Sequence, residues 1–224
     1  MMICYLVPAL SLSIAAEPAE PLDAFLERWA AAMAGLETLE VRFRQEKSIR
    51  ILRRPLVSSG TIRLRLKDQR LRCTTLDAAG KPETEISAAQ GTVRILYPGL
   101  KRMEVYDLGG SAPPPVAFPG LGGDIAALKR DYEIARTSDG AKDSLRLTPR
   151  DAASPLRALT LVLEKLEPRA LVQEAKNGDL VKLTIESFKR QAPLSDADLE
   201  IVVPPGTTVV RPLGGSGNTK EAKQ

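Results

Sequence analysis

The stretch Leu159-Thr160-Leu161-Val162-Leu163 is apolar at every second residue, and the same alternation returns in Val93-Arg94-Ile95-Leu96-Tyr97 and in Met103-Glu104-Val105. Successive side chains of a strand point to opposite faces, so this pattern predicts strands with one apolar face and one wet face. The pattern extends from Val41 to Val203. It predicts a mainly β fold with some α, in which one antiparallel sheet needs a cover for its apolar face.

The length and composition favour one domain with an aliphatic interior. A chain of 224 residues is an ordinary length for a single β domain, and it is 43% hydrophobic but only 4% aromatic. Residues 1–16 are apolar and end in small residues, which predicts a signal peptide. The positively charged N-terminal region of a usual signal peptide is missing, and a buried first strand is the alternative. One domain then spans residues 17–213, and the polar tail 214–224 is expected to be disordered.

The charges and cysteines exclude several classes of protein. The net charge is +4, and many arginines alternate with apolar residues, which favours a solvated outer face or attraction to anionic lipid. These are Arg42, Arg44, Arg63, Arg65, Arg70 and Arg72. Nucleic-acid binding would need basic residues among exposed aromatics or a recognition helix, so we expect no nucleic-acid partner. Removal of residues 1–16 would leave only Cys73, which we interpret as a small apolar strand residue without a disulfide.

A helix is predicted before the first strand. Apolar residues recur at helical spacing from Pro21 to about Thr38, with Gly35 near the end. They are Leu22, Phe25, Leu26, Trp29, Met33 and Leu36. We expect Phe25, Trp29 and Met33 to pack onto the sheet, with the ring nitrogen of Trp29 near the rim.

Turn residues separate ten or so strands. Asp139-Gly140 and Asn177-Gly178 are strong hairpin signals, because these residues tolerate positive φ. One segment, residues 109–115, contains three consecutive prolines and cannot continue a sheet. Asp124 then caps a predicted short helix. Leu121, Ile125 and Leu128 would form either a movable cover or a fixed crossover packed on the core.

No catalytic constellation is evident. The chain has no histidine, which removes the usual nucleophile–base sites and the commonest transition-metal ligand. It also lacks a phosphate-binding loop and zinc-type cysteine spacing. Carboxylate pairs such as Glu83/Glu85 and Asp196/Asp198 lie beside turns, where solvated charge is the ordinary role. We therefore expect no enzyme, no cofactor and no metal.

The order of the motifs carries a resemblance to a known family. A predicted N-terminal helix runs into Val41-x-Phe43-x-Gln45, followed by the strands 59–64, 96–106 and 145–149 and by the ending 199–210. This order resembles the periplasmic outer-membrane lipoprotein carrier family, LolA, over roughly residues 22–211. The chain looks like a divergent member. It lacks the tryptophan that often precedes the Tyr-x-Pro turn, and only Arg63 and Arg65 lie near the place of the family's lid-locking arginine.

The resemblance implies an unclosed antiparallel β-barrel, or half-barrel, whose apolar face is covered by an N-terminal helix and a short lid helix. It also implies a periplasmic carrier that takes acylated lipoproteins from an inner-membrane ABC exporter and hands them to an outer-membrane acceptor. We expect a monomer. The residues expected to line the lipid site are Phe43, Ile62, Leu64, Ile95, Tyr97, Met103, Val105, Leu145, Leu147, Leu161, Leu163, Leu183 and Ile185.

Other interpretations stay open at this point. The thirteen residues expected to line the lipid site, called wall residues below, would equally suit an ordinary packed core. The same scaffold could serve as a regulatory module that senses lipoproteins, or as a carrier of another envelope lipid such as a glycolipid or pigment ester. An envelope enzyme is disfavoured by the missing histidine and nucleophile motifs.

Overall fold

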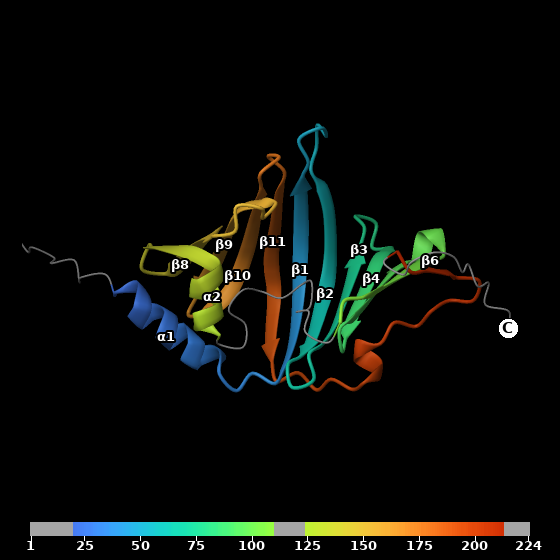
Figure 1. Ribbon diagram of the computed structural model, residues 1–224, viewed down its shortest axis with the longest axis horizontal. Helices are drawn as coiled ribbons and strands as arrows, with labels where there is room; N and C mark the ends of the chain where they lie inside the picture. Colours follow the sequence, from blue (N-terminus) through green and yellow to red (C-terminus); the bar gives the residue numbers. More distant parts are fainter. Residues whose placement is uncertain (1–19, 110–123, 213–224) are drawn as a thin grey trace, which may run out of the picture.

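A computed structural model describes residues 20–109 and 124–212 and shows one unclosed sheet of 12 strands (Figure 1). The strand order is β12-β6-β5-β4-β3-β2-β1-β11-β10-β9-β8-β7. The strands are β1 (Thr38–Ser48), β2 (Leu56–Arg65), β3 (Arg70–Leu76), β4 (Pro82–Ala89), β5 (Thr92–Tyr97), β6 (Arg102–Asp107), β7 (Tyr132–Ser138), β8 (Lys142–Pro149), β9 (Leu156–Glu164), β10 (Glu167–Ala175), β11 (Leu180–Arg190) and β12 (Thr208–Val210). The expected fold class, a mainly β half-barrel with helices, is confirmed.

Some of the expectations fall outside this range. The predicted signal peptide, most of the proline-bearing segment, Leu121 and the polar tail lie beyond the described residues. None of the helices within the described ranges is long and apolar enough to cross a bilayer.

The register of the strands assigns each side chain to one of two faces. Val41 lies opposite Ile62 on one side and Phe188 on the other, and Leu161 lies between Leu145 and Leu171. We call the face that carries these residues the inner face, because the N-terminal helix packs against it. The arginines of β1, β2 and β3 occupy the opposite, outer face, as their alternation predicted. The expectation that they are solvated there is wrong for Arg65, Arg70 and Arg72, whose side chains are 12%, 17% and 19% exposed and form ion pairs.

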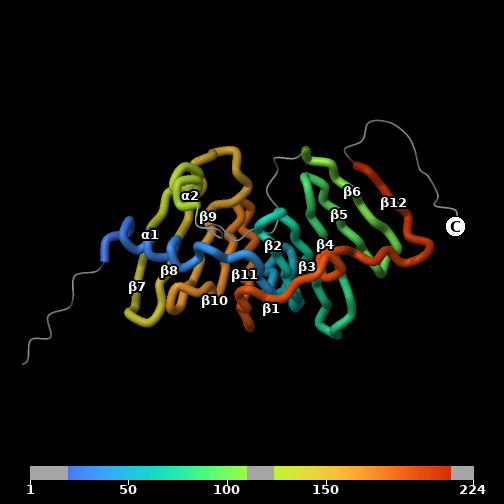
Figure 2. Tube along the Cα trace, turned by 90° about the horizontal axis from the view of Figure 1, so that it is seen from below, coloured from blue at the N-terminus to red at the C-terminus, as the bar shows by residue number. Residues whose placement is uncertain are grey.

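Helix α1 (Leu22–Met33) lies under the β7–β11 half of the sheet (Figures 1 and 2). Phe25, Leu26, Trp29 and Met33 are at most 1% exposed, in agreement with the helical spacing of these apolar residues. The helix ends earlier than predicted, because Ala34 is extended and Gly35 has a φ of +73°, which glycine adopts without strain. Leu36 stays buried but belongs to the connection to β1.

Two further predictions of local structure are confirmed. Gly140 and Gly178 have positive φ in the turns that join β7 to β8 and β10 to β11. The short helix α2 (Ile125–Asp131) begins where expected, since the Asp124 carboxylate accepts a 2.8 Å hydrogen bond from the Ala127 backbone nitrogen. α2 contacts α1 and β7.

The chain after β11 crosses the outer face of β2, β3 and β4 before it reaches the far edge of the sheet (Figure 2). It includes the 3-10 helix η2 (Ala197–Leu199) and ends in β12, which pairs in parallel with β6. Another 3-10 helix, η1 (Pro98–Leu100), joins β5 to β6. The crossing segment covers a second, small apolar cluster of Leu96, Met103 and Val105.

Candidate functional site

The inner face forms one continuous apolar cluster that extends from β5 to β8. Cross-strand pairs such as Leu64–Leu71, Val41–Ile62 and Leu145–Leu161 bring residues far apart in sequence together. Eleven of the thirteen expected wall residues lie on this face by register. They are Phe43, Ile62, Leu64, Ile95, Tyr97, Leu145, Leu147, Leu161, Leu163, Leu183 and Ile185. Whether they bind lipid remains a prediction.

The expectation for Met103 and Val105 is wrong about the face they occupy. In the β5–β6 ladder Ile95 lies opposite Glu104, and Leu96 lies opposite Met103. Met103 and Val105 therefore point to the outer face, where they pack with Ile201 and Val209. The error arose because Ile95, Leu96 and Tyr97 are all apolar, so alternation in β5 does not define one face.

The wall residues differ in how accessible they are. Leu145, Leu147, Leu161 and Leu163 are 0% exposed beneath the half of the sheet that carries α1. Ile95 and Leu183 are only half-buried, although both pack on the inner cluster. These two residues therefore offer positions where the inner face can be changed with little disturbance of the core.

Both described helices contribute to the cover. Phe25, Trp29 and Met33 of α1 join the inner cluster, as does Leu128 of α2, which is 4% exposed. Ile125 is half-buried and packs against the same cluster. The expected helix and lid residues that the structure describes thus meet on one face of the sheet.

The indole nitrogen of Trp29 does not lie at the rim, contrary to the expectation. Trp29 is 1% exposed, and its Nε1 is buried without a hydrogen-bond partner among residues 20–109 and 124–212. A buried donor without an acceptor is rare in folded proteins and costs roughly 1–3 kcal/mol. The inner cluster therefore contains one polar group that a bound oxygen atom would satisfy.

An arginine that the sequence reasoning missed ties α1 to the edge of the sheet. Arg136 of β7 lies on the inner face, 13% exposed at its side chain, and its Nη2 lies 2.8 Å from the Asp143 carboxylate. Its Nη1 donates a 2.9 Å hydrogen bond to the backbone oxygen of Glu20, next to the start of α1. The signal for this role is that Arg136 takes a place in the apolar alternation of Tyr132 and Ile134.

Arg63 and Arg65, the positions suggested for a lid-locking arginine, lie on the outer face instead. Arg63 pairs with Glu40 at 3.0 Å, and this guanidinium holds the pKa of the Glu40 carboxyl below its usual range. Arg65 pairs with Asp68 and, at 2.6 Å, with Asp196 of the crossing segment. These arginines are therefore separated from α1 and α2 by the sheet itself.

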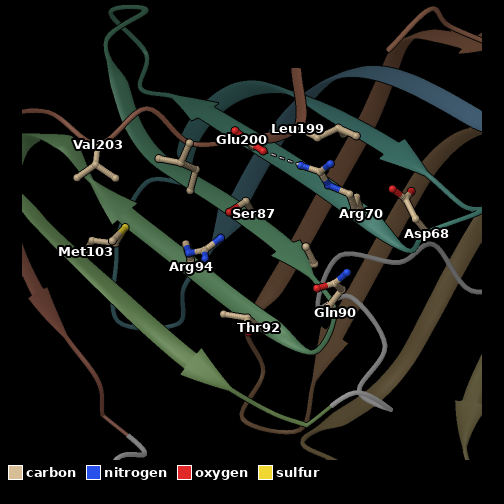
Figure 3. Close-up of a pocket in the computed structure, with 12 residues that line it drawn as sticks. Asp68, Arg70, Ser87, Gln90, Thr92, Arg94, Met103, Leu199, Glu200 and Val203 are labelled. Atoms are coloured by element: carbon tan, nitrogen blue, oxygen red, sulfur yellow. Dashed lines mark hydrogen bonds and ion pairs between the residues drawn. The ribbon is translucent and has the colours of Figure 1, made fainter. Parts of the chain in front are cut away.

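A cavity of about 660 Å³ lies on the outer face, between β3–β6 and the crossing segment (Figure 3). Arg70, Ser87 and Arg94 line it together with acidic and apolar groups, and Arg70 donates to Glu200 at 3.2 Å. Its mixed charges suit water or a small polar molecule better than a hydrocarbon chain. The apolar inner face is therefore the better candidate for a lipid site.

Neither a metal-type cluster nor a reactive thiol is found among the described residues. No group of three or more His, Cys, Asp or Glu side chains within residues 20–109 and 124–212 is placed to hold a metal ion. Cys73 lies buried on the inner face, and desolvation raises the pKa of its thiol to about 11. Such a thiol is protonated and unreactive at neutral pH.

No family model and no curated protein matches the chain. It is similar to the crystal structure of an uncharacterized conserved protein from Thermus thermophilus, with a TM-score of 0.53 and 13% identity over 84% of this chain and 98% of that one. A LolA superfamily protein from Nitrosomonas europaea has a TM-score of 0.41 and 12% identity, and the match covers 80% of this chain and 97% of that one. Lipoprotein LppX of Mycobacterium tuberculosis has a TM-score of 0.40 and 11% identity, and the match covers 77% of this chain and 95% of that one.

Identities this low concern the fold and carry no conclusion on function. Within that limit, the likeness to the Thermus thermophilus protein, at a TM-score of 0.53, shows a shared fold, and the resemblance to the LolA family stays a prediction from the sequence.

Proposed function

We propose that the protein is a periplasmic carrier that holds the acyl chains of lipoproteins against its inner face and moves them from the inner to the outer membrane. The observation that carries the proposal is the continuous aliphatic cluster of the unclosed sheet, with a helix lying over one half of it. A core of this shape can be opened by moving one helix, without breaking any strand pair.

Helix α1 covers the β7–β11 half of the inner face, so lipid that binds there must displace part of this cover. Lifting α1 exposes four side chains, Phe25, Leu26, Trp29 and Met33, at about 1.5–3 kcal/mol each. An acyl chain of about fourteen carbons gains about ten kcal/mol on leaving water. The two terms are similar in size, so a chain that enters between the lifted α1 and the sheet would bind reversibly, as a carrier requires.

The unpartnered Nε1 of Trp29 supports an acylated cargo. It is a buried donor inside an aliphatic cluster. The ester or amide carbonyl at the head of an acyl chain is an acceptor, and it would satisfy this donor while the chain contacts the leucines around it.

Trp29 also provides the test, because it is the only tryptophan of the chain. A stearic acid that carries a nitroxide along its chain should quench most of the Trp29 fluorescence when it enters the inner face. Unlabelled fatty acid should restore the signal by competition. If saturating nitroxide lipid leaves the fluorescence of the folded protein unchanged, the proposal is wrong.

Matched variants locate the binding surface. Ile95→Gln and Leu183→Gln place amides on the inner face at half-buried positions, whereas Arg94→Gln and Lys182→Gln change their outer-face neighbours. We expect the two inner-face substitutions together to weaken the affinity for the nitroxide lipid, as measured by quenching, by at least about tenfold, since two apolar side chains are lost from the wall. The outer pair should bind as the unchanged protein does.

The handover partners follow from the same proposal. An inner-membrane ABC exporter would load the carrier, and an outer-membrane acceptor would unload it. Native mass spectrometry of protein purified from its own periplasm would identify the cargo, and a glycolipid or pigment ester in place of a lipoprotein would assign the chain to another envelope lipid.

A further inference from the structure

The hairpin between β1 and β2 exposes more apolar surface than a solvated turn needs. Ile51 is 87% exposed, and Leu52, Leu56 and Val57 are 43%, 52% and 37% exposed. Leu180, at the start of the adjoining strand β11 and 37% exposed, extends this surface. Apolar side chains gathered at one place on a surface, unlike single scattered ones, mark a site of interaction.

The end of the same hairpin has a net charge equal to that of the whole chain. Residues 47–57, which we call the hairpin tip, contain Lys47, Arg50, Arg53 and Arg54 and no acidic residue, while the whole chain has a formal net charge of +4. The remainder of the chain is therefore neutral overall. All four cations are exposed, and none forms an ion pair within the described part of the chain.

The acidic group that accepts a hydrogen bond from the tip does not neutralise it. Asp179, in the neighbouring β10–β11 turn, accepts a 2.9 Å hydrogen bond from the backbone nitrogen of Arg50 and another from Asn177. Its carboxylate thus holds the base of the hairpin in place and pairs with none of the guanidinium groups. Lys176 lies in the same turn and offsets the charge of Asp179.

The tip projects beyond the other strand ends, on the side of the molecule away from α1 (Figure 1). A flat surface can therefore contact it without meeting the helices or the crossing segment. Because the β1–β2 ladder ends at Lys47 and Leu56, the connecting residues present their apolar and cationic side chains together at the end of one hairpin.

We propose that the hairpin tip docks the protein on anionic lipid bilayers, with Ile51, Leu52 and Leu56 entering the interface and the arginines contacting phosphate headgroups. Charge decides for this occupant over an apolar protein groove: arginine binds phosphate through paired N–H donors, and each cation near an anionic surface strengthens binding several-fold. Aliphatic side chains add the short-range attraction that holds an interfacial segment in place. The proposal does not depend on the carrier function.

Flotation with vesicles tests it. The unchanged protein should float with vesicles of phosphatidylcholine containing phosphatidylglycerol and much less with phosphatidylcholine alone, and added salt should release it. Replacing Arg50, Arg53 and Arg54 together by glutamine should weaken binding to the anionic vesicles by at least about tenfold. Ile51→Asp should weaken it as well, although it leaves the three arginines in place.

A matched control removes the same charge elsewhere. The residues to replace are Lys67, Lys142 and Lys165. All three are exposed, and they lie in turns or at strand ends, at the end of the sheet opposite to the hairpin tip. Their triple replacement by glutamine should leave vesicle binding within about twofold of the unchanged protein, since these residues are far from the docked surface. Equal losses in the two triple variants would show a diffuse charge effect and overturn the proposal, as would failure of the unchanged protein to float.

A second measurement distinguishes a membrane from a protein partner. Tryptophan placed by Ile51→Trp should shift its emission to the blue on anionic vesicles, whereas Leu100→Trp, in the exposed turn between β5 and β6, should not. Sedimentation without lipid should show a monomer. A dimer that Ile51→Asp dissociates would assign the tip to contact between copies of the chain, and the membrane proposal would fall.

Discussion

The guanidinium carbon of Arg136 lies 3.9 Å from the centroid of the Phe25 ring. Phe25 is the most N-terminal fully buried residue of α1, and Arg136 comes from the edge strand β7. The same guanidinium pairs with Asp143 and donates to the Glu20 backbone, so one side chain joins the helix, the segment before it and the sheet.

Arg136→Lys should therefore loosen α1. A lysine keeps the charge but cannot bond Asp143 and the Glu20 carbonyl at once in the planar geometry of arginine. We expect amide hydrogens of α1 to exchange at least about tenfold faster, with little change in β1 and β2, as measured by hydrogen exchange and mass spectrometry. Arg157→Lys, an exposed change in β9, is the control; equal exchange in the two variants would contradict a clamp.

Gly60→Ala should be strongly destabilising. A Cβ on Gly60 would lie 2.3 Å from the Thr74 backbone oxygen and 2.6 Å from Cζ of Phe43, so both the β2–β3 pair and a core ring would have to move. Overpacking of this kind costs about 1–3 kcal/mol or more. Urea unfolding measures the loss. Gly99→Ala, which has open space around it, should change the stability little.

Cys73 should report whether the inner face opens. Burial raises the pKa of its thiol to about 11, so the folded protein has little thiolate at pH 8. In a Cys4→Ser background we expect slow alkylation by iodoacetamide at pH 8 and a rapid reaction after unfolding in urea. Arg136→Lys should increase the native rate if α1 movement admits the reagent. Rapid alkylation of the unchanged native protein would contradict a closed inner face.

The pair of Glu40 and Arg63 should make stability depend on pH. The folded state lowers the pKa of Glu40, first through its hydrogen bond with Arg63, so the pair stabilises the protein above the pKa of the unfolded chain. This contribution is lost as the pH falls through the folded pKa. Glu40→Gln should therefore cost up to about 1 kcal/mol at pH 7 and much less at pH 3, by urea unfolding. Glu46→Gln, at an exposed pair of the same strand, should show little difference between the two pH values.

Local sequence signals predicted much of the fold because they act over a few residues. The spacing of Phe25, Trp29 and Met33 predicted the buried side of α1, and the Asn177-Gly178 turn predicted a hairpin. The alternation in β9 likewise placed Leu161 and Leu163 on the inner face. From Leu159 to Leu163, one side of this strand carries only leucines, whereas Thr160 and Val162 occupy the other side.

Relations over long distances could not be read in the same way. Register decides the face of Met103, because its strand pairs with a run that is apolar on both sides. The partner of Arg136 comes from before α1, 116 residues earlier in the chain. The charges of the hairpin tip were visible in the sequence, but the exposure of Ile51 depends on how far β1 and β2 extend beyond their neighbours.

The parallel pairing of β12 with β6 has a consequence for biogenesis. Thr208 pairs with Arg102, so the edge of β6 keeps its unpaired backbone groups until synthesis has reached Val210 and the connecting chain has wrapped the outer face. An open strand edge invites pairing with other chains, and a contact this distant in sequence forms late. A nascent chain that stalls before residue 208 should therefore be prone to aggregation, and it would need a chaperone that shields strand edges.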